Sequence, residues 1–253
     1  MTIGADCGII PRMSRVGILL ILLLTGCVSD WHAPDDFIYN PIDTGTFEIA
    51  TWQKITDTTA PVHIYIEGDG HAFNGRGMPT ADPTPHGTQV REWAARDVAP
   101  NVVYMARPCQ YIMSPSCNTF DWTDGRFSPR VIDSMAAAVT QVAAARPVVL
   151  IGYSGGALAS GLIIQKYPQI NVAKWITIAG VLNHADWTEY FGDSPLKSSI
   201  NMDTLPRIQQ THYVAENDQT VPNSLSFKWT GGANTVVVPG ATHDDFGQWQ
   251  PEI

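Results

Sequence analysis

The chain has 253 residues, of which 44% are hydrophobic and 15% charged, and its formal net charge is −9. This composition can form one catalytic-size domain with a full core, and it is too hydrophobic for a largely disordered chain. The sequence contains no run of Lys and Arg, so we expect no nucleic-acid binding, because phosphate binding needs clustered cations.

The N-terminal segment has the pattern of an export signal. Arg12 and Arg15 precede an apolar run at residues 16–24, which is too short to span a bilayer. The run ends in Leu-Thr-Gly and then Cys27, which resembles the lipobox of bacterial lipoproteins, whose cysteine is acylated and becomes the new N-terminus. We therefore expect residues 1–26 to be a lipoprotein signal peptide and Cys27 to carry the lipid anchor.

The same resemblance implies a location. Val28 follows the cysteine, whereas an Asp at this position would favour a different sorting route. We therefore expect the lipid anchor to lie in the outer membrane of a bacterial cell envelope, with the chain facing the periplasm. Two alternatives remain open, an uncleaved anchor and an ordinary signal peptide with a chance cysteine. The start codon is Met1 or Met13.

After the anchor, residues 27–44 are polar and contain proline, which is typical of a tether, and we expect a folded domain over 45–253. Within it, β-branched stretches alternate with helical ones. The expected strands are 47–55, 62–66, 101–106, 147–151, 172–178, 212–215 and 235–238, and the expected helices are 90–97, 129–145 and 157–167. This rhythm predicts an α/β fold with a doubly wound, mostly parallel sheet and helices on both faces.

Cys109 and Cys117 form a close pair in a loop with Pro and Ser after the strand at 101–106. In an exported protein we expect them to form a disulfide, the alternative being two free thiols. Metal binding is disfavoured because no further Cys or nearby His accompanies them, and we expect neither a metal nor a cofactor.

The apolar run 147–151 predicts a buried central strand, and it leads directly into Gly152-Tyr153-Ser154-Gly155-Gly156. G-x-S-x-G between a strand and a helix is the pattern of a nucleophile elbow, in which Ser154 would be the nucleophile. The glycines at 152 and 156 are needed where strand and helix approach closely. Without this setting, the five residues would indicate only a Gly-rich turn.

With this motif, the chain resembles the α/β-hydrolase superfamily over about residues 47–246. The resemblance implies an acid on the loop after a late strand, where Asp218 precedes Val-Pro, and a histidine after the last strand, where His243 lies. Asp218 would orient His243, and His243 would take the proton of Ser154. The rival histidines are His71, His86, His184 and His212, and none of them matches this order and place. Of these, we expect His86 and His212 to be packing or surface residues.

The resemblance also implies an oxyanion hole made by the backbone N–H of Gly155 and by that of Asp69 or Gly70. Here the sequence departs from the common pattern, because Glu67 stands where a histidine is usual and Asp69 carries a carboxylate. A carboxylate facing the oxyanion would oppose catalysis, so we expect the Asp69 side chain to point away and only its amide to donate. The alternative, that residues 67–70 bind a phosphate, is disfavoured because they lack the lysine and the spacing of a P-loop.

The expected activity is hydrolysis of carboxylic esters through an acyl-enzyme, as in esterases, lipases or thioesterases, with a small-molecule acyl ester as the partner. The segment between the strands at 172–178 and 212–215 leaves little room for a large lid, which favours short or soluble acyl groups. Trp187, Tyr190 and Phe191 in this segment could line an acyl pocket or cover the core. The alternatives are a serine aminopeptidase or amidase, and a non-catalytic envelope lipoprotein on a hydrolase scaffold.

Overall fold

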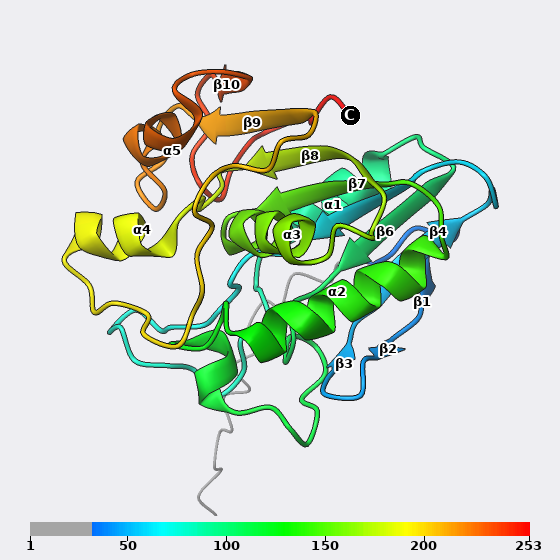
Figure 1. Ribbon diagram of the computed structural model, residues 1–253, viewed down its shortest axis with the longest axis horizontal. Helices are drawn as coiled ribbons and strands as arrows, with labels where there is room; N and C mark the ends of the chain where they lie inside the picture. The colour runs from blue at the N-terminus through cyan, green and yellow to red at the C-terminus, as the bar shows by residue number, and fades with distance from the viewer. Residues whose placement is uncertain (1–31) are drawn as a thin grey trace, which may run out of the picture.

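The computed structural model describes residues 32–253, so the expected signal peptide and Cys27 lie outside the described residues. Its centre is an eight-stranded sheet in the order β1-β4-β6-β5-β7-β8-β9-β10 (Figure 1). The strands of this sheet are β1 (Ile38–Tyr39), β4 (Thr51–Ile55), β5 (Val62–Ile66), β6 (Asn101–Met105), β7 (Val148–Tyr153), β8 (Val172–Ile178), β9 (Gln210–Ala215) and β10 (Thr235–Val238). The helices are α1 (Gln89–Arg96), α2 (Pro129–Ala143), α3 (Gly155–Lys166), α4 (His184–Phe191) and α5 (Asn223–Thr230), with a short 3-10 helix at Thr119–Trp122.

From β6 to β10 the neighbouring strands are parallel, and only β1 and β4 run antiparallel to their neighbours. The carboxyl ends of the parallel strands therefore meet at one edge of the sheet. The loops that leave β5, β7, β9 and β10 carry the residues 67–70, Ser154, Asp218 and His243 to this edge. The α/β fold with a mostly parallel sheet is as the sequence predicts.

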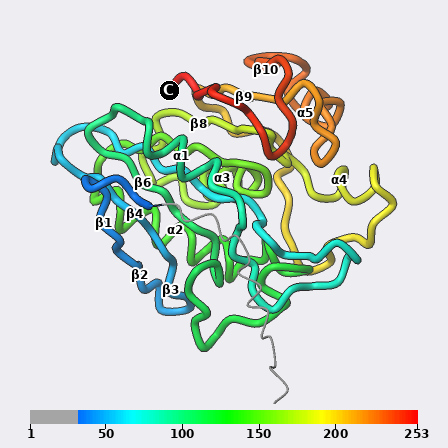
Figure 2. The backbone as a smooth tube through the Cα atoms, turned by 180° about the vertical axis from the view of Figure 1, so that it is seen from behind, coloured from blue at the N-terminus to red at the C-terminus, as the bar shows by residue number. Residues whose placement is uncertain are grey.

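Both faces of the central strands are buried, which explains their nearly continuous apolar sequences. In β7, Leu150 packs in the core on the side of α2 and α3, while Ile151 packs in the core on the side of α1. The second core also contains Trp93 of α1 and Phe246 of the C-terminal segment. Figure 1 shows α2 and α3 in front of the sheet, and Figure 2 shows the opposite side, where α1 lies. The helices thus cover both faces, as expected.

The N-terminal part of the domain differs in detail from the prediction. The expected strand at 47–55 consists of β3 (Glu48–Ile49) and β4, and β3 forms a two-stranded sheet with β2 (Ile42–Asp43) instead of joining the main sheet. Part of the expected tether 27–44 belongs to the fold, because Ile42 and Phe37 are buried apolar side chains. The compact part of the chain therefore begins before residue 45.

Helices α4 and α5 were not predicted. The side chain of Asn183 caps α4 by accepting hydrogen bonds from the amides of Ala185 and Asp186, and Gly192 ends the helix in the left-handed conformation. Each of the two helices has only eight residues. Among residues 32–253, none of the helices has the length and apolar character needed to span a bilayer.

The expected disulfide is present. Cys109 and Cys117 are bonded, with their Cα atoms 5.8 Å apart. The bridge closes the loop between β6 and the 3-10 helix, and Cys109 is buried in the core beside α2. This loop comes from the same edge of the sheet as the residues described next.

Candidate active site

Ser154 lies in a sharp turn between β7 and α3. Its backbone has φ 49° and ψ −122°, a conformation that is strained for a residue with a side chain. The amide of Ser154 donates to the carbonyl of Ile178 at 3.0 Å, and its carbonyl accepts from the amide of Val181 at 3.0 Å. These bonds tie the turn to β8 and hold the serine at the edge of the sheet.

The glycines around Ser154 are required by close contacts. A Cβ atom on Gly152 would lie 2.4 Å from the carbonyl oxygen of Gly156, and one on Gly156 would lie 2.5 Å from that of Ile66. These neighbours are backbone atoms that cannot move aside. The turn therefore has the geometry of a nucleophile elbow, for the steric reason that the sequence indicates.

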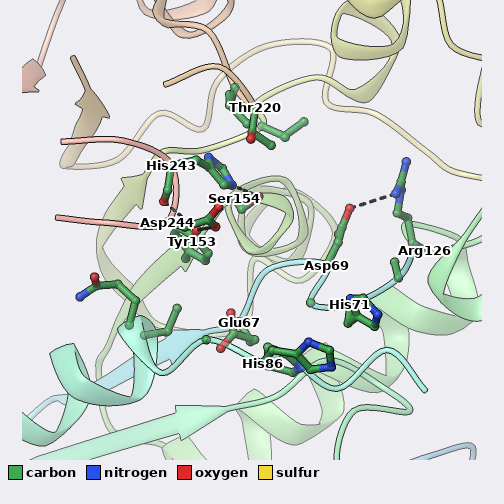
Figure 3. A pocket seen from close by; sticks show the side chains of 18 of the residues that line it. Glu67, Asp69, His71, His86, Arg126, Tyr153, Ser154, Thr220, His243 and Asp244 are labelled. Atoms are coloured by element: carbon green, nitrogen blue, oxygen red, sulfur yellow. Dashed lines mark hydrogen bonds and ion pairs between the residues drawn. The ribbon is translucent and has the colours of Figure 1, made fainter. Parts of the chain in front are cut away.

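Figure 3 shows His243 beside this serine, and Asp218 hydrogen-bonds to the far side of the imidazole. The Nε2 atom of His243 is 3.1 Å from the Oγ of Ser154, and its Nδ1 atom is 2.9 Å from the Oδ2 of Asp218. The other carboxylate oxygen of Asp218 accepts from the amides of Thr220 and Val221, at 2.9 and 2.7 Å. The structure thus brings the three predicted residues into one chain of hydrogen bonds, with the imidazole between the carboxylate and the hydroxyl.

Tyr153 supports the histidine and was not singled out from the sequence. Its hydroxyl donates to the backbone carbonyl of His243 at 2.8 Å, and the two rings lie 5.2 Å apart. The hydroxyl also lies 3.3 Å from the carboxylate of Asp244. Because Tyr153 is adjacent to Ser154 in sequence, this contact couples the position of the histidine loop to that of the turn.

Residues 67–70 run past the start of α3, as an oxyanion hole requires. A Cβ on Gly68 would lie 3.0 Å from the Cβ of Ser154, so this turn packs directly on the serine. The amide of Gly68 donates to the side chain of Glu67 at 2.8 Å, whereas the amides of Asp69 and Gly70 have no partner within residues 32–253. Asp69 and Gly70 also line the cavity in front of Ser154, so both remain candidate donors.

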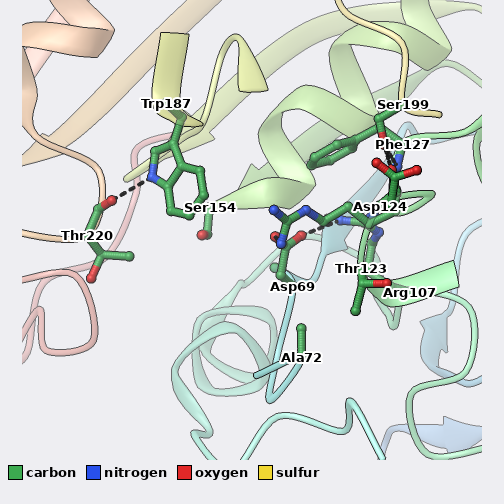
Figure 4. Close-up of polar contacts among 12 residues, drawn as sticks. Asp69, Ala72, Arg107, Thr123, Asp124, Phe127, Ser154, Trp187, Ser199 and Thr220 are labelled. Carbon is green, nitrogen blue, oxygen red and sulfur yellow. Dashed lines mark hydrogen bonds and ion pairs between the residues drawn. The ribbon is translucent and has the colours of Figure 1, made fainter. Parts of the chain in front are cut away.

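The side chain of Asp69 differs from the expectation. A Cβ on Gly155 would lie only 2.1 Å from its Oδ1, so the carboxylate rests against the start of α3 and does not point away from it. It forms ion pairs with Arg107 and Arg126, each at 3.1 Å and each through a different oxygen (Figures 3 and 4). Two guanidinium groups therefore more than offset the negative charge of Asp69 beside the candidate oxyanion hole.

Glu67, the other departure from the common pattern, is buried. Its carboxylate accepts from the amide of Gly68 and from the hydroxyl of Tyr104, both at 2.8 Å. Burial raises the pKa of this carboxyl, while these hydrogen bonds and the charges of Arg91 and Arg107 oppose the shift. Glu67 thus fixes the start of the turn and leaves the next two amides free to donate.

A cavity of about 770 Å³ opens in front of Ser154 and His243. Trp187 of α4 lies in its wall and donates from its indole N–H to the carbonyl of Thr220 at 2.7 Å (Figure 4). Tyr190 and Phe191, which the sequence grouped with Trp187, are exposed and are not among the residues that line the cavity. Of the three aromatic side chains, Trp187 is therefore the candidate for contact with a substrate.

The remaining histidines have separate environments. His71 and His86 stack with ring centroids 4.1 Å apart in the cavity wall, a pairing that no sequence pattern predicts. His184 also lines the cavity and stacks on Phe127, and burial lowers its pKa. His212 lies in the core of the sheet, where burial lowers its pKa to about 4. Within the described part of the chain, no group of three or more Asp, Glu, His or Cys side chains could hold a metal ion.

The chain resembles known proteins in its three-dimensional structure. No protein-family model matches the chain, and no curated protein does. An α/β serine hydrolase without a lid from Xanthomonas campestris is similar at 16% identity and a TM-score of 0.53, covering 83% of this chain and 87% of that one. An α/β serine hydrolase homologue from Coxiella burnetii is similar at 15% identity and a TM-score of 0.55, covering 82% and 89%. Est1E from Butyrivibrio proteoclasticus is similar at 14% identity and a TM-score of 0.52, covering 81% and 90%. The chain therefore has the α/β-hydrolase fold.

Proposed function

We propose that the chain is a serine hydrolase that cleaves carboxylic esters. The observation that carries the proposal is the continuous chain of hydrogen bonds from Asp218 through His243 to Ser154, the last two of which line the cavity. A serine hydroxyl becomes a good nucleophile when a neighbouring base takes its proton during attack. Among the described residues, Ser154 is the only serine that lines this cavity.

In the proposed reaction, the Oγ of Ser154 attacks the ester carbonyl while its proton moves to Nε2 of His243. Asp218 holds the imidazole in the required tautomer and stabilises its positive charge without taking the proton. The amides of Gly155 and of Asp69 or Gly70 donate to the oxygen that becomes negative. His243 then protonates the departing alcohol, which leaves an acyl group on Ser154.

The second half of the reaction reverses these roles. His243 takes a proton from a water molecule, the resulting hydroxide attacks the acyl carbonyl, and the proton returns to Ser154 as the carboxylic acid leaves. Between β8 and β9 the chain forms only the eight-residue helix α4 and loops, so no large lid covers the cavity in the described structure. An uncovered cavity supports short or soluble acyl groups as substrates.

The experiment is a series of p-nitrophenyl esters with acyl chains of graded length, together with an anilide of the best acyl group. We expect saturable hydrolysis with the highest kcat/KM on short chains, and slower cleavage of the anilide. Faster cleavage of the anilide would favour an amidase or aminopeptidase. Hydrolysis that is equally fast in Ser154→Ala would contradict the proposal.

We also propose that the chain is anchored to a bacterial envelope through lipid on Cys27. The support comes from the sequence, where a basic flank, an apolar run and small residues precede that cysteine. The disulfide between Cys109 and Cys117 is consistent with an oxidising compartment. The outer membrane, facing the periplasm, is the proposed location.

A further inference from the structure

The ion pairs around Asp69 place an excess of positive charge beside the candidate oxyanion hole. Arg107 and Arg126 share this single carboxylate, and both guanidinium side chains are almost fully buried, with 5% and 7% of their surfaces exposed. Arg107 also interacts with the buried carboxylate of Glu67, which in turn interacts with Arg91. Three cations and two anions leave a net charge of one positive unit. A buried charge that is not balanced by a partner is costly, unless an anion forms nearby when the site works.

Further contacts hold both guanidinium groups in place. Arg107 packs over the ring of Phe127, with 5.0 Å between its Cζ atom and the ring centroid, and it donates to the backbone carbonyl of Arg126. Arg126 lies 5.7 Å from the ring centroids of both Phe73 and Trp187, in the wall of the cavity. The cluster is thus built from the loops after β5 and β6, from the segment that precedes α2, and from helix α4.

The carboxylate of Asp69 is in contact with Gly155, whose amide is the first candidate donor to the oxyanion. Its Oδ1 lies 2.1 Å from the position where Gly155 would carry a Cβ, so a larger residue there would displace the carboxylate. An uncompensated carboxylate at this place would repel the negative oxygen of a tetrahedral intermediate. With two guanidinium groups attached to it, the cluster attracts that oxygen instead.

We infer that Arg107 and Arg126 are positioning residues of the oxyanion hole, which hold Asp69 against Gly155 and give this side of the hole a net positive charge. The inference rests on the proposed function and explains why an aspartate can occupy this position. Substrate esters are neutral, so the charge acts on the transition state and much less on the bound substrate. It should therefore affect kcat more than KM.

The test removes one charge and then restores the balance. Arg126→Met leaves the cluster neutral, and we expect kcat for a neutral ester to fall by about 10- to 100-fold, with KM changed by less than about threefold. The double variant Arg126→Met with Asp69→Asn returns the net charge to one positive unit, and we expect it to recover most of the lost kcat. Arg126→Lys keeps the charge and should stay within a few-fold of wild type.

A second measurement follows the oxyanion directly. A trifluoromethyl ketone forms a hemiketal oxyanion on an active serine, and its Ki should rise in Arg126→Met by the same factor by which kcat/KM falls. Lys166→Met is the matched control, because it removes a cation that pairs with Asp133 at 2.8 Å, and neither residue lines the cavity. This control should leave kcat and Ki unchanged. Should methionine prevent folding, Arg126→Gln repeats the comparison with a side chain that is polar but uncharged.

The possible outcomes separate this inference from the proposed function. If wild type is active and Arg126→Met is equally active, or is impaired without recovery in the double variant, the positioning role is wrong while the hydrolase remains. If the wild-type chain hydrolyses no ester and binds no trifluoromethyl ketone, both ideas are overturned. Recovery in the double variant, together with parallel changes in Ki and kcat/KM, would support the role of the cluster.

Discussion

At the scale of single residues, the hydrogen-bonded side chains of Ser154, His243 and Asp218 determine whether the proposed reaction proceeds. We expect Ser154→Ala and His243→Ala to lower kcat by about 10⁴-fold or more, because each removes a group that the chemical step needs. Asp218→Asn should cause a smaller loss, since the imidazole remains next to the serine. Steady-state ester hydrolysis measures all three variants.

The control for these substitutions is the folded state of each variant. Circular dichroism and the Tm should remain close to wild type for Ser154→Ala, because the hydroxyl is removed from a cavity wall and not from the core. A folded Ser154→Ala variant with wild-type kcat would show that the reaction occurs elsewhere. A combined variant should lose no more than the worst single one, since the residues act as a unit.

These residues were predictable because each follows a recognisable strand, and parallel strands bring their carboxyl ends to one edge. The partners of Asp69 were not predictable. Arg107 and Arg126 lie in separate loops, and an ion pair between distant segments leaves no periodic pattern in the sequence. For the same reason, the contact between Tyr153 and the His243 loop became visible only in the structure.

At the scale of elements, the disulfide loop after β6 supports the cavity wall. Gln110 lies next to Cys109, and its side chain accepts from the amide of Arg107 at 2.9 Å and donates to the carbonyl of Gly68 at 3.0 Å. We expect Cys109→Ser with Cys117→Ser to cost about 2–3 kcal/mol of stability, because the unfolded chain is no longer constrained by the bridge. The Tm should fall by about 5–10 °C.

The same double variant should raise KM more than it lowers kcat, because a looser loop displaces the cavity wall before it displaces Ser154, His243 and Asp218. Thermal melts and ester kinetics with and without reductant provide the comparison, since reduced wild type should behave like the variant. An unchanged Tm in the variant would mean that packing alone holds this loop. Alkylation of both thiols in the unreduced protein would show that the bridge does not form.

The elements themselves were predicted with unequal success. The short apolar runs predict the central strands, whereas the β-branched pattern of 47–55 predicts one strand where Ala50 separates β3 from β4. Helices α4 and α5 were missed because eight residues give little more than two turns of periodicity. Their stability depends on caps and on packing against the rest of the domain, and α4 contributes Trp187 to the cavity.

At the scale of the whole molecule, stability should depend on pH through His212 in the core. Its Nδ1 atom is 2.9 Å from the hydroxyl of Thr177, and burial lowers its pKa from 6.5 to about 4. The unfolded chain therefore binds a proton as the pH falls below 6.5, while the folded chain does not. The free energy of unfolding therefore keeps the contribution of the neutral ring above that pH and loses about 3 kcal/mol as the pH falls toward 4.

Urea unfolding at several pH values between 7 and 4.5 tests this dependence. His212→Gln should show a flatter decline than wild type, because glutamine does not titrate. Glu67 acts in the opposite sense, since its raised pKa makes the folded chain bind a proton more readily, but it is present in both proteins. Equal slopes for wild type and His212→Gln would exclude the histidine as the cause.

The anchoring of the whole molecule is tested at Cys27, outside the described residues. Cys27→Ser should prevent lipid attachment and leave the precursor uncleaved by lipoprotein signal peptidase, so that its mass includes the signal peptide. Mass spectrometry of the membrane fraction measures both changes. A mature wild-type chain that begins at another residue and carries no lipid would contradict the anchor.

The central claim, that His243 and Asp218 activate Ser154, is tested most directly by labelling with a fluorophosphonate, which reacts with activated serines whatever the substrate. We predict that the intact mass of the wild-type chain increases by one probe and that peptide mapping locates the probe on Ser154. Ser154→Ala should remain unlabelled, and His243→Ala should label far more slowly. A folded wild-type chain that gains no probe, or a Ser154→Ala variant that labels as fast as wild type, would contradict the account.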